Sequence, residues 1–208
     1  MKLATSRLTA IAALAVAPIL AISGAAVAAT TITFQCRASA AGQTADFSLN
    51  QDVTPSAPAT VAAGGSLAVV VDPAPNTVPA EAGGYTVRNV QSLVLKMPVP
   101  ANSTYVSATL AGGSGLNSTP TIALEGSDVV LKVPGPVNGG ANFELPTVTL
   151  NLTAGGSGAI DSKLGGTSYD DPGLTFTANV DGPLGIPISA PAKCYPNPNP
   201  TLTSTTIG

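Results

Sequence analysis

Four aspartates in the last third of the chain come closest to the spacing of a chemical site. Asp161, Asp170, Asp171 and Asp181 follow one another closely, and segment 169–173, YDDPG, could present oxygen atoms to Ca²⁺ from a turn. Adjacent aspartates point in different directions on an extended chain, however, and the D-x-D-x-D-G pattern of a calcium loop is missing. Because Asp-Pro-Gly is also a common turn sequence, we expect a turn here, with calcium at Asp161, Asp170 and Asp171 as the alternative.

The motifs of the common enzyme classes are missing. The chain has no histidine, which removes the commonest general base, the commonest metal ligand and any Ser-His-Asp triad. Segments 112–116 and 155–159 approach the G-x-S-x-G nucleophile elbow but lack its last glycine. A two-carboxylate glycosidase would want sugar-stacking aromatic residues, and the chain has no Trp and 4% aromatic residues. We therefore predict a protein that is not an enzyme, with no catalytic residues, cofactor or metal.

The two cysteines, Cys36 and Cys194, predict a single disulfide. They lie near the two ends of the mature chain, and in an oxidising compartment the simplest outcome is a bond that joins the first strand to the last. A redox or metal pair is the alternative, but the C-x-x-C spacing and the histidine that it would need are absent.

The N-terminal segment 1–28 has the features of a secretory signal peptide. Lys2 and Arg7 precede an apolar run over 8–22, and a small-residue site ends at Ala28. A retained membrane anchor is the alternative, although the run is interrupted by Pro18 and has no basic flank after it. Cleavage after Ala28 would leave 208 − 28 = 180 residues, enough for one domain. We expect a secreted or envelope-associated protein with no transmembrane segment after cleavage.

Charge argues against nucleic acid and anionic lipid as partners. Without Lys2 and Arg7 the chain keeps 8 − 2 = 6 basic residues against 11 acidic ones, a formal charge of −5. Both kinds of partner demand clustered Lys and Arg. The remaining basic residues are scattered singly along the sequence: Arg37, Arg88, Lys96, Lys132, Lys163 and Lys193.

Short apolar runs between Pro-, Asn- and Gly-rich turns predict an all-β fold. The clearest stretch shows four strands in a row, over 90–97, 103–110, 121–124 and 128–133. Strand spacing of about ten residues with no helical period predicts an antiparallel, two-sheet, immunoglobulin-like β-sandwich of roughly eight to ten strands. We place this single domain at 29–194.

Alternation along the strands predicts which side chains form the core. The expected core faces are Ile32, Phe34 and Cys36 in the first strand, Val106, Ala108 and Leu110 in a middle strand, and Val148, Leu150 and Leu152 in a later one.

Two segments outside the expected strands are candidates for binding a partner. The loop over 72–84 holds three prolines and a Gly-Gly pair and is a candidate binding loop. Residues 195–208 are rich in Pro and Thr and predict an extended tail that could add a strand to a partner.

Several phrases resemble a known group of proteins. They are TITFQC, LKMPVPANSTYVSATLAGGS, VLKVPGPVNGG, FELPTVTLNL and SYDDPGLTFTANV, together with the late cysteine. In these the chain is similar to secreted β-sandwich proteins of mycolate-bearing actinobacteria of the Rhodococcus and Nocardia type. Members are sometimes labelled cyclase or dehydratase, a label to which the missing histidine gives no physical support. The resemblance implies kinship and fold, and it carries over no functional residue.

The sequence predicts that the protein acts by binding other molecules. The leading hypothesis is a non-catalytic secreted envelope or surface protein that contacts an envelope component or a protein partner. A module that binds lipid or glycan, between the sheets or at the loop 72–84, is the second hypothesis. A hydrolase or cyclase is the third, and would require convergent carboxylates in a cleft.

Overall fold

A computed structural model describes residues 29–40, 42–182 and 185–208, and these ranges contain seventeen strands and no α-helix. The main sheet consists of β1 (Thr30–Ala40), β2 (Gln43–Ser56), β4 (Ser66–Pro73), β6 (Glu81–Ala82), β7 (Tyr85–Pro98), β8 (Ser103–Ala111), β9 (Thr121–Glu125), β10 (Asp128–Val133), β11 (Val137–Asn138), β13 (Thr147–Ala154), β15 (Leu174–Asp181) and β16 (Pro187–Pro196). One small sheet pairs β5 (Asn76–Thr77) with β12 (Asn142–Phe143). Another contains β3 (Thr60–Val61), β14 (Gly158–Ser162) and β17 (Thr203–Ile207).

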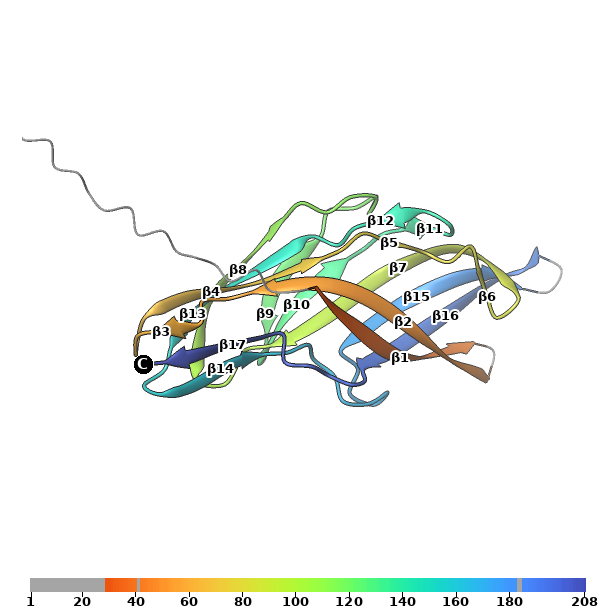
Figure 1. Ribbon diagram of the computed structural model, residues 1–208. Coiled ribbons are helices and arrows are strands. Elements are labelled where there is room, and N and C mark those ends of the chain that lie inside the picture. The colour runs from red at the N-terminus through yellow and green to blue at the C-terminus, as the bar shows by residue number, and fades with distance from the viewer. Residues whose placement is uncertain (1–28, 41, 183–184) are drawn as a thin grey trace, which may run out of the picture.

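The main sheet runs β8-β13-β4-β2-β1-β16-β15-β7-β10-β9, with β6 and β11 also paired to β7. Its two outer strands, β8 and β9, come close to each other, so the sheet curls and nearly closes into a barrel. The long strands β1, β2, β7, β15 and β16 extend side by side toward one end of the molecule (Figure 1). The sheet of β3, β14 and β17 lies at the other end (Figure 1).

The prediction of an antiparallel all-β fold is confirmed, but the division into two sheets and the number of strands differ. All pairings between described strands are antiparallel except that of β17 with β3. Long strands change partner along their length: β2 pairs with β1 over 43–53 and with β4 over 53–56. Such strands join what would otherwise be separate sheets. The Pro- and Gly-rich connections also form several two-residue strands, which raise the number above the expected eight to ten.

Alternation predicts the core correctly on β1 and β13. Ile32, Phe34 and Cys36 are 0 to 3% exposed. Val148, Leu150 and Leu152 on β13 are equally buried, while the Thr and Asn side chains between them are half-buried. Removing this apolar area from water is the main stabilising contribution that the core can make.

The expected core face of β8 is wrong at Val106. This side chain is 59% exposed, whereas Tyr105 packs against the core. The pairing of β8 with β13 shifts here, from Ser107 opposite Asn151 to Tyr105 opposite Leu152, so Val106 has no partner. A β-bulge of this kind inserts one residue and exchanges the two faces of the strand beyond it.

The predicted disulfide is confirmed: Cys36 and Cys194 are bonded, and both are fully buried. The bond joins β1 to β16, in which the two cysteines are directly opposite each other, and not to the last strand, because β17 follows β16. Neighbouring strands at the centre of the main sheet are thereby linked across 158 residues of sequence.

The expected tail is part of the folded body. Tyr195 belongs to β16, and β17 pairs with β14 on one side and with β3 on the other. Thr205 is fully buried and donates a hydrogen bond to the carbonyl of Pro58 at 2.6 Å. Leu202 and Ile207 are also buried. Because both edges of β17 are occupied, this strand is not free to pair with a partner.

The segment 72–84 is partly ordered as strands. It contains β5 and β6, and Val78 between them is 4% exposed. The predicted signal peptide 1–28, with its cleavage site at Ala28, lies outside the described residues. No helix within the described ranges is long and apolar enough to cross a membrane.

Candidate functional site

A cleft of about 320 Å³ with a mixed lining of charged, polar and apolar residues is the best candidate site in the described part of the chain. Its volume lies at the lower end of the range for small-ligand sites. The cleft lies beside β7, β10 and the loop 163–171, and its lining residues are Lys96, Pro98, Asp128, Lys163, Leu164, Gly165, Gly166, Thr167, Asp171 and Asn199.

The two ends of a loop over 165–173 are attached to Lys96 on β7. The backbone N–H of Gly165 donates to the carbonyl of Lys96, and the N–H of Lys96 donates to the carbonyl of Gly173, both at 2.8 Å. The N–H of Gly173 also donates to the carbonyl of Cys194 at 2.9 Å. The loop that lines the cleft is therefore anchored to the sheet next to the disulfide.

Glycines allow the two ends of this loop to cross closely. A Cβ atom on Gly173 would lie 1.6 Å from the carbonyl oxygen of Gly165, and one on Gly166 would lie 2.1 Å from the nitrogen of Gly173. Gly166 also has a φ of +91°, in the region that favours glycine. No other residue type fits this crossing without a shift of backbone.

The tip of the loop forms the turn that the sequence predicts. The N–H of Thr167 donates to the carbonyl of Asp171 at 3.0 Å, and the Thr167 hydroxyl donates to Oδ2 of Asp171 at 2.9 Å. The hydroxyl oxygen of Ser168 accepts from the N–H groups of Asp170 and Asp171. These local bonds hold the hydroxyl of Thr167 and the carboxylate of Asp171 together at the cleft.

Tyr169 fixes the outer side of the same loop. Its ring packs edge-on against Tyr195 with centroids 5.2 Å apart, and the guanidinium of Arg37 lies 4.2 Å from its centroid. Arg37 also donates two hydrogen bonds to Asp46, at 2.7 and 2.8 Å. The hydrogen bonds from Arg37 lower the pKa of Asp46 below its usual value, and those to Asp46 raise the pKa of Arg37.

The aspartates considered for calcium do not gather. Asp161 is exposed on β14, Asp181 pairs with Arg88, and Asp171 is bonded to Thr167. Within the described ranges no three His, Cys, Asp or Glu side chains lie close enough to hold a metal ion.

Two lysines that are far apart in the sequence meet at the cleft. Three basic residues form ion pairs: Arg37 with Asp46, Arg88 with Asp181 and Lys132 with Glu125. Lys96, Lys163 and Lys193 form none with the described residues, and the first two line the cleft. Sequence reasoning singled out Asp171 but missed the rest of this site, because its residues are 103 positions apart at the extremes, from 96 to 199, and carry no motif.

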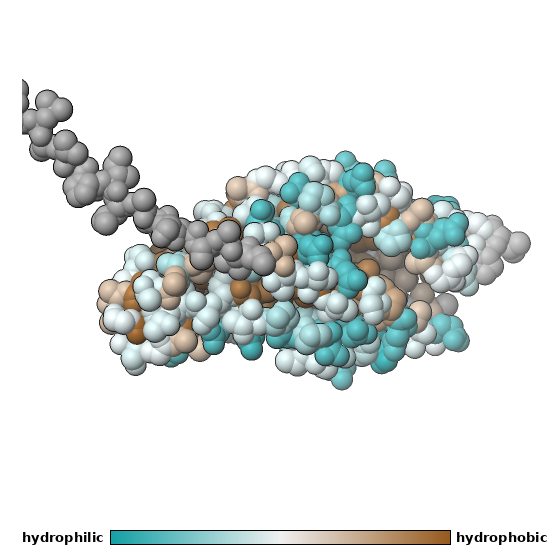
Figure 2. All heavy atoms as spheres, viewed as in Figure 1, coloured by the Kyte–Doolittle hydropathy of each residue, from teal (hydrophilic) through white to brown (hydrophobic). Residues whose placement is uncertain are grey.

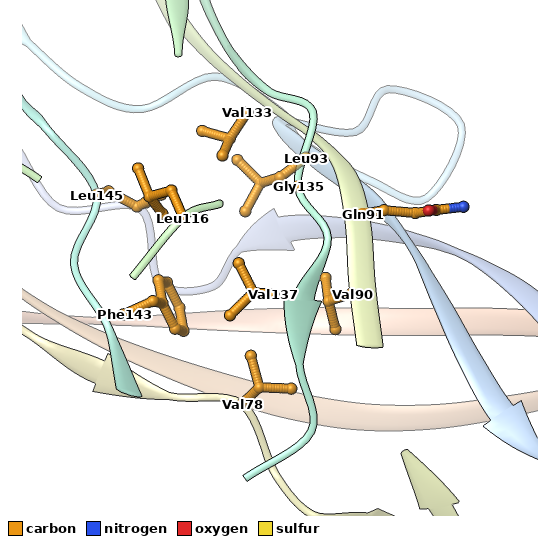
Figure 3. Close-up of a pocket in the computed structure, with 10 residues that line it drawn as sticks. All are labelled: Val78, Val90, Gln91, Leu93, Leu116, Val133, Gly135, Val137, Phe143 and Leu145. Atoms are coloured by element: carbon orange, nitrogen blue, oxygen red, sulfur yellow. The ribbon is translucent and has the colours of Figure 1, made fainter. Parts of the chain in front are cut away.

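A second cavity lies inside the fold and is apolar, but its volume is only about 30 Å³. Figure 3 shows Val78, Leu116, Val137 and Phe143 pointing into it, while the amide of Gln91 points away. A lipid chain needs far more room, because small-ligand sites span roughly 300 to 1,000 Å³. The lipid hypothesis therefore gains no support from the core.

The face of the molecule in Figure 2 likewise gives no support to a lipid site. On the face in Figure 2, hydrophobic residues form separate spots rather than one wide patch.

Comparisons of the chain with protein-family models, with curated proteins and with solved structures gave no match. The described residues form an all-β protein with a small surface cleft whose lining includes charged residues.

Proposed function

We propose that this chain is a non-catalytic secreted protein of the cell envelope or cell surface, which acts by binding an envelope polymer or a protein partner. The observation that carries the proposal is the cleft, because its loop is anchored at both ends and needs little ordering on binding. The buried disulfide suits the oxidising compartment that secretion implies.

The sheet acts in this proposal as a rigid scaffold. We interpret the curled main sheet as an immunoglobulin-like sandwich whose two layers are joined by strands that change partner. The resemblance of the strand and turn phrases to secreted proteins of mycolate-bearing actinobacteria supports the choice of the envelope as the location. Nucleic acid stays an unfavourable partner, since the formal charge after cleavage is 6 − 11 = −5.

Among the binding alternatives, glycan is favoured over lipid. The open cleft has four charged residues in its mixed lining, and the apolar cavity of about 30 Å³ is too small for an acyl chain. The displaced pKa values of Arg37 and Asp46 come from an exposed ion pair outside the cleft lining, and they give no reason to place chemistry there.

A sedimentation assay tests the proposal. The oxidised chain over 29–208 is incubated with envelopes separated into peptidoglycan with its attached arabinogalactan and an extractable lipid fraction. We expect saturable sedimentation with the polysaccharide fraction, and none by an unrelated secreted all-β protein of similar charge. If neither fraction binds the chain, the envelope role is wrong.

A further inference from the structure

The cleft holds separated charges of both signs. Lys96 and Lys163 line it together with Asp128 and Asp171, yet neither lysine forms an ion pair with either aspartate. Elsewhere in the described chain, Arg37, Arg88 and Lys132 each have a carboxylate partner. Oδ2 of Asp171 accepts from the Thr167 hydroxyl, but none of the four charged groups in the cleft is neutralised by an ion pair, so they can act as donors and acceptors for a ligand.

The balance of these charges indicates the class of ligand. Two ammonium groups and two carboxylates give no net attraction for an anion or for a cation. A hydroxyl group can donate to a carboxylate and accept from an ammonium at the same time, and hydrogen bonds to charged groups are the stronger kind. A neutral ligand with several adjacent hydroxyls makes the fullest use of such a lining.

Asn199 forms part of the wall of the cleft. Its Nδ2 atom donates to the carbonyl of Leu164 at 2.8 Å, which fixes the orientation of the amide. Its Oδ1 atom is buried and accepts no hydrogen bond from the described residues. Its side-chain amide is therefore held at the cleft lining, where its NMR signal reports on a ligand that enters.

We infer that the cleft binds one neutral sugar unit of a glycan, with the two lysines as donors and Asp128 and Asp171 as acceptors. The inference rests on the proposed function and gives its polymer a chemical class. A volume of about 320 Å³ suits a single ring with part of its neighbour. The glycine crossing at the base of the loop keeps Asp171 in place before the ligand arrives, and Lys96 and Asp128 are held by the strands β7 and β10.

Nuclear magnetic resonance tests the inference on the oxidised chain over 29–208. Neutral trisaccharides of galactose, arabinose and glucose are titrated into the ¹⁵N-labelled protein, with glycine and inorganic phosphate as the charged probes. At least one trisaccharide should shift the backbone amides of Gly165, Gly166 and Thr167 and the side-chain amide of Asn199, with saturation. Glycine and phosphate should leave these signals in place.

Matched variants connect the shifts to the charges. Lys163→Gln and Asp128→Asn each remove one charged group from the cleft, and each should weaken trisaccharide binding about ten-fold, as expected for a hydrogen bond to a charged group. Lys193→Gln removes an exposed lysine that forms no ion pair and lies outside the cleft, and should leave the affinity unchanged. Near-UV circular dichroism checks that all three variants keep the fold.

The inference is overturned if no trisaccharide shifts these amides, if glycine or phosphate does so instead, or if Lys163→Gln and Lys193→Gln behave alike. Its failure can be told from failure of the proposed function. If the Lys163→Gln and Asp128→Asn variants still sediment with envelopes, the envelope role stands but the cleft is not the site that binds the envelope. If the cleft binds a trisaccharide but the protein does not sediment with envelopes, the sugar site is supported and the envelope role is wrong.

Discussion

Loss of the disulfide should cost this protein a large part of its stability. The bond between Cys36 and Cys194 closes a loop of 158 residues in the unfolded chain. In the chain-entropy description, 2.1 + 1.5R ln 158 is about 17 cal/mol/K, or about 5 kcal/mol at 25 °C. Single domains are stable by about 5 to 15 kcal/mol, so a loss of this size brings the reduced protein close to unfolding.

Urea unfolding followed by circular dichroism measures this effect on three samples: the oxidised protein, the reduced protein and the C36A/C194A variant. The free energy of unfolding should fall by about 5 kcal/mol on reduction. The variant should lose slightly more, because both sulfur atoms are fully buried and their removal leaves a small cavity. The dependence on urea should also steepen, since an uncrosslinked chain exposes more surface.

Two results would refute this reasoning. A loss below about 1 kcal/mol in both the reduced protein and the variant would mean that the bond does not restrict the unfolded chain. A large loss in C36A/C194A with almost none on reduction would assign the stability to packing of the sulfur atoms. Mass spectrometry of the alkylated protein confirms the redox state of each sample.

Three further predictions concern other elements. Leu202→Ala and Ile207→Ala should each lower the free energy of unfolding by about 2 kcal/mol or more, because both side chains are buried around β17; a free tail would show no change in the same urea assay. Gly173→Ala should lower the free energy of unfolding by about 1 to 3 kcal/mol and speed hydrogen exchange at the Lys96 amide, which donates to the carbonyl of Gly173. Gly156→Ala is the control: its Cβ position has open space around it, so the free energy of unfolding should change by no more than about 0.5 kcal/mol. The stability that comes from the lowered pKa of Asp46 should be present above its usual value of 3.8 and be lost as pH falls through the lowered value. A carbon-13 titration of the Asp46 carboxyl should show the pKa return toward 3.8 in Arg37→Gln, and an unchanged pKa would contradict the assigned cause.

Alternation was a good guide where a strand keeps one partner register. It placed Ile32 and Phe34 on β1 and Leu150 on β13 in the core, because side chains on a regular strand point to opposite faces in turn. It failed at Val106, where a bulge shifts the pairing by one residue and reverses the two faces. Bulges depend on the neighbouring strand, and so a single run of residues does not reveal them.

The candidate site was beyond sequence reasoning for a similar reason. The turn over 167–171 was predictable from its Asp, Pro and Gly residues, and it lines one side of the cleft. Its opposite side comes from Lys96 and Asp128 on β7 and β10. Only the order of strands in the sheet brings these residues to Lys163, and that order follows from long-range pairing that no local pattern encodes.

The place of β1 in the main sheet has a consequence for how the protein is made. The partner of β1 on one edge, β2, follows it directly in the chain, but the partner on its other edge, β16, carries a cysteine 158 residues further along and is synthesised much later. At ordinary rates of synthesis that interval is roughly 8 to 30 seconds, during which an unpaired strand edge and a free thiol are exposed together. A ribosome-bound intermediate of this kind would be at risk of wrong pairing. Export of the chain before it folds, followed by oxidation outside the cytoplasm, would avoid that risk.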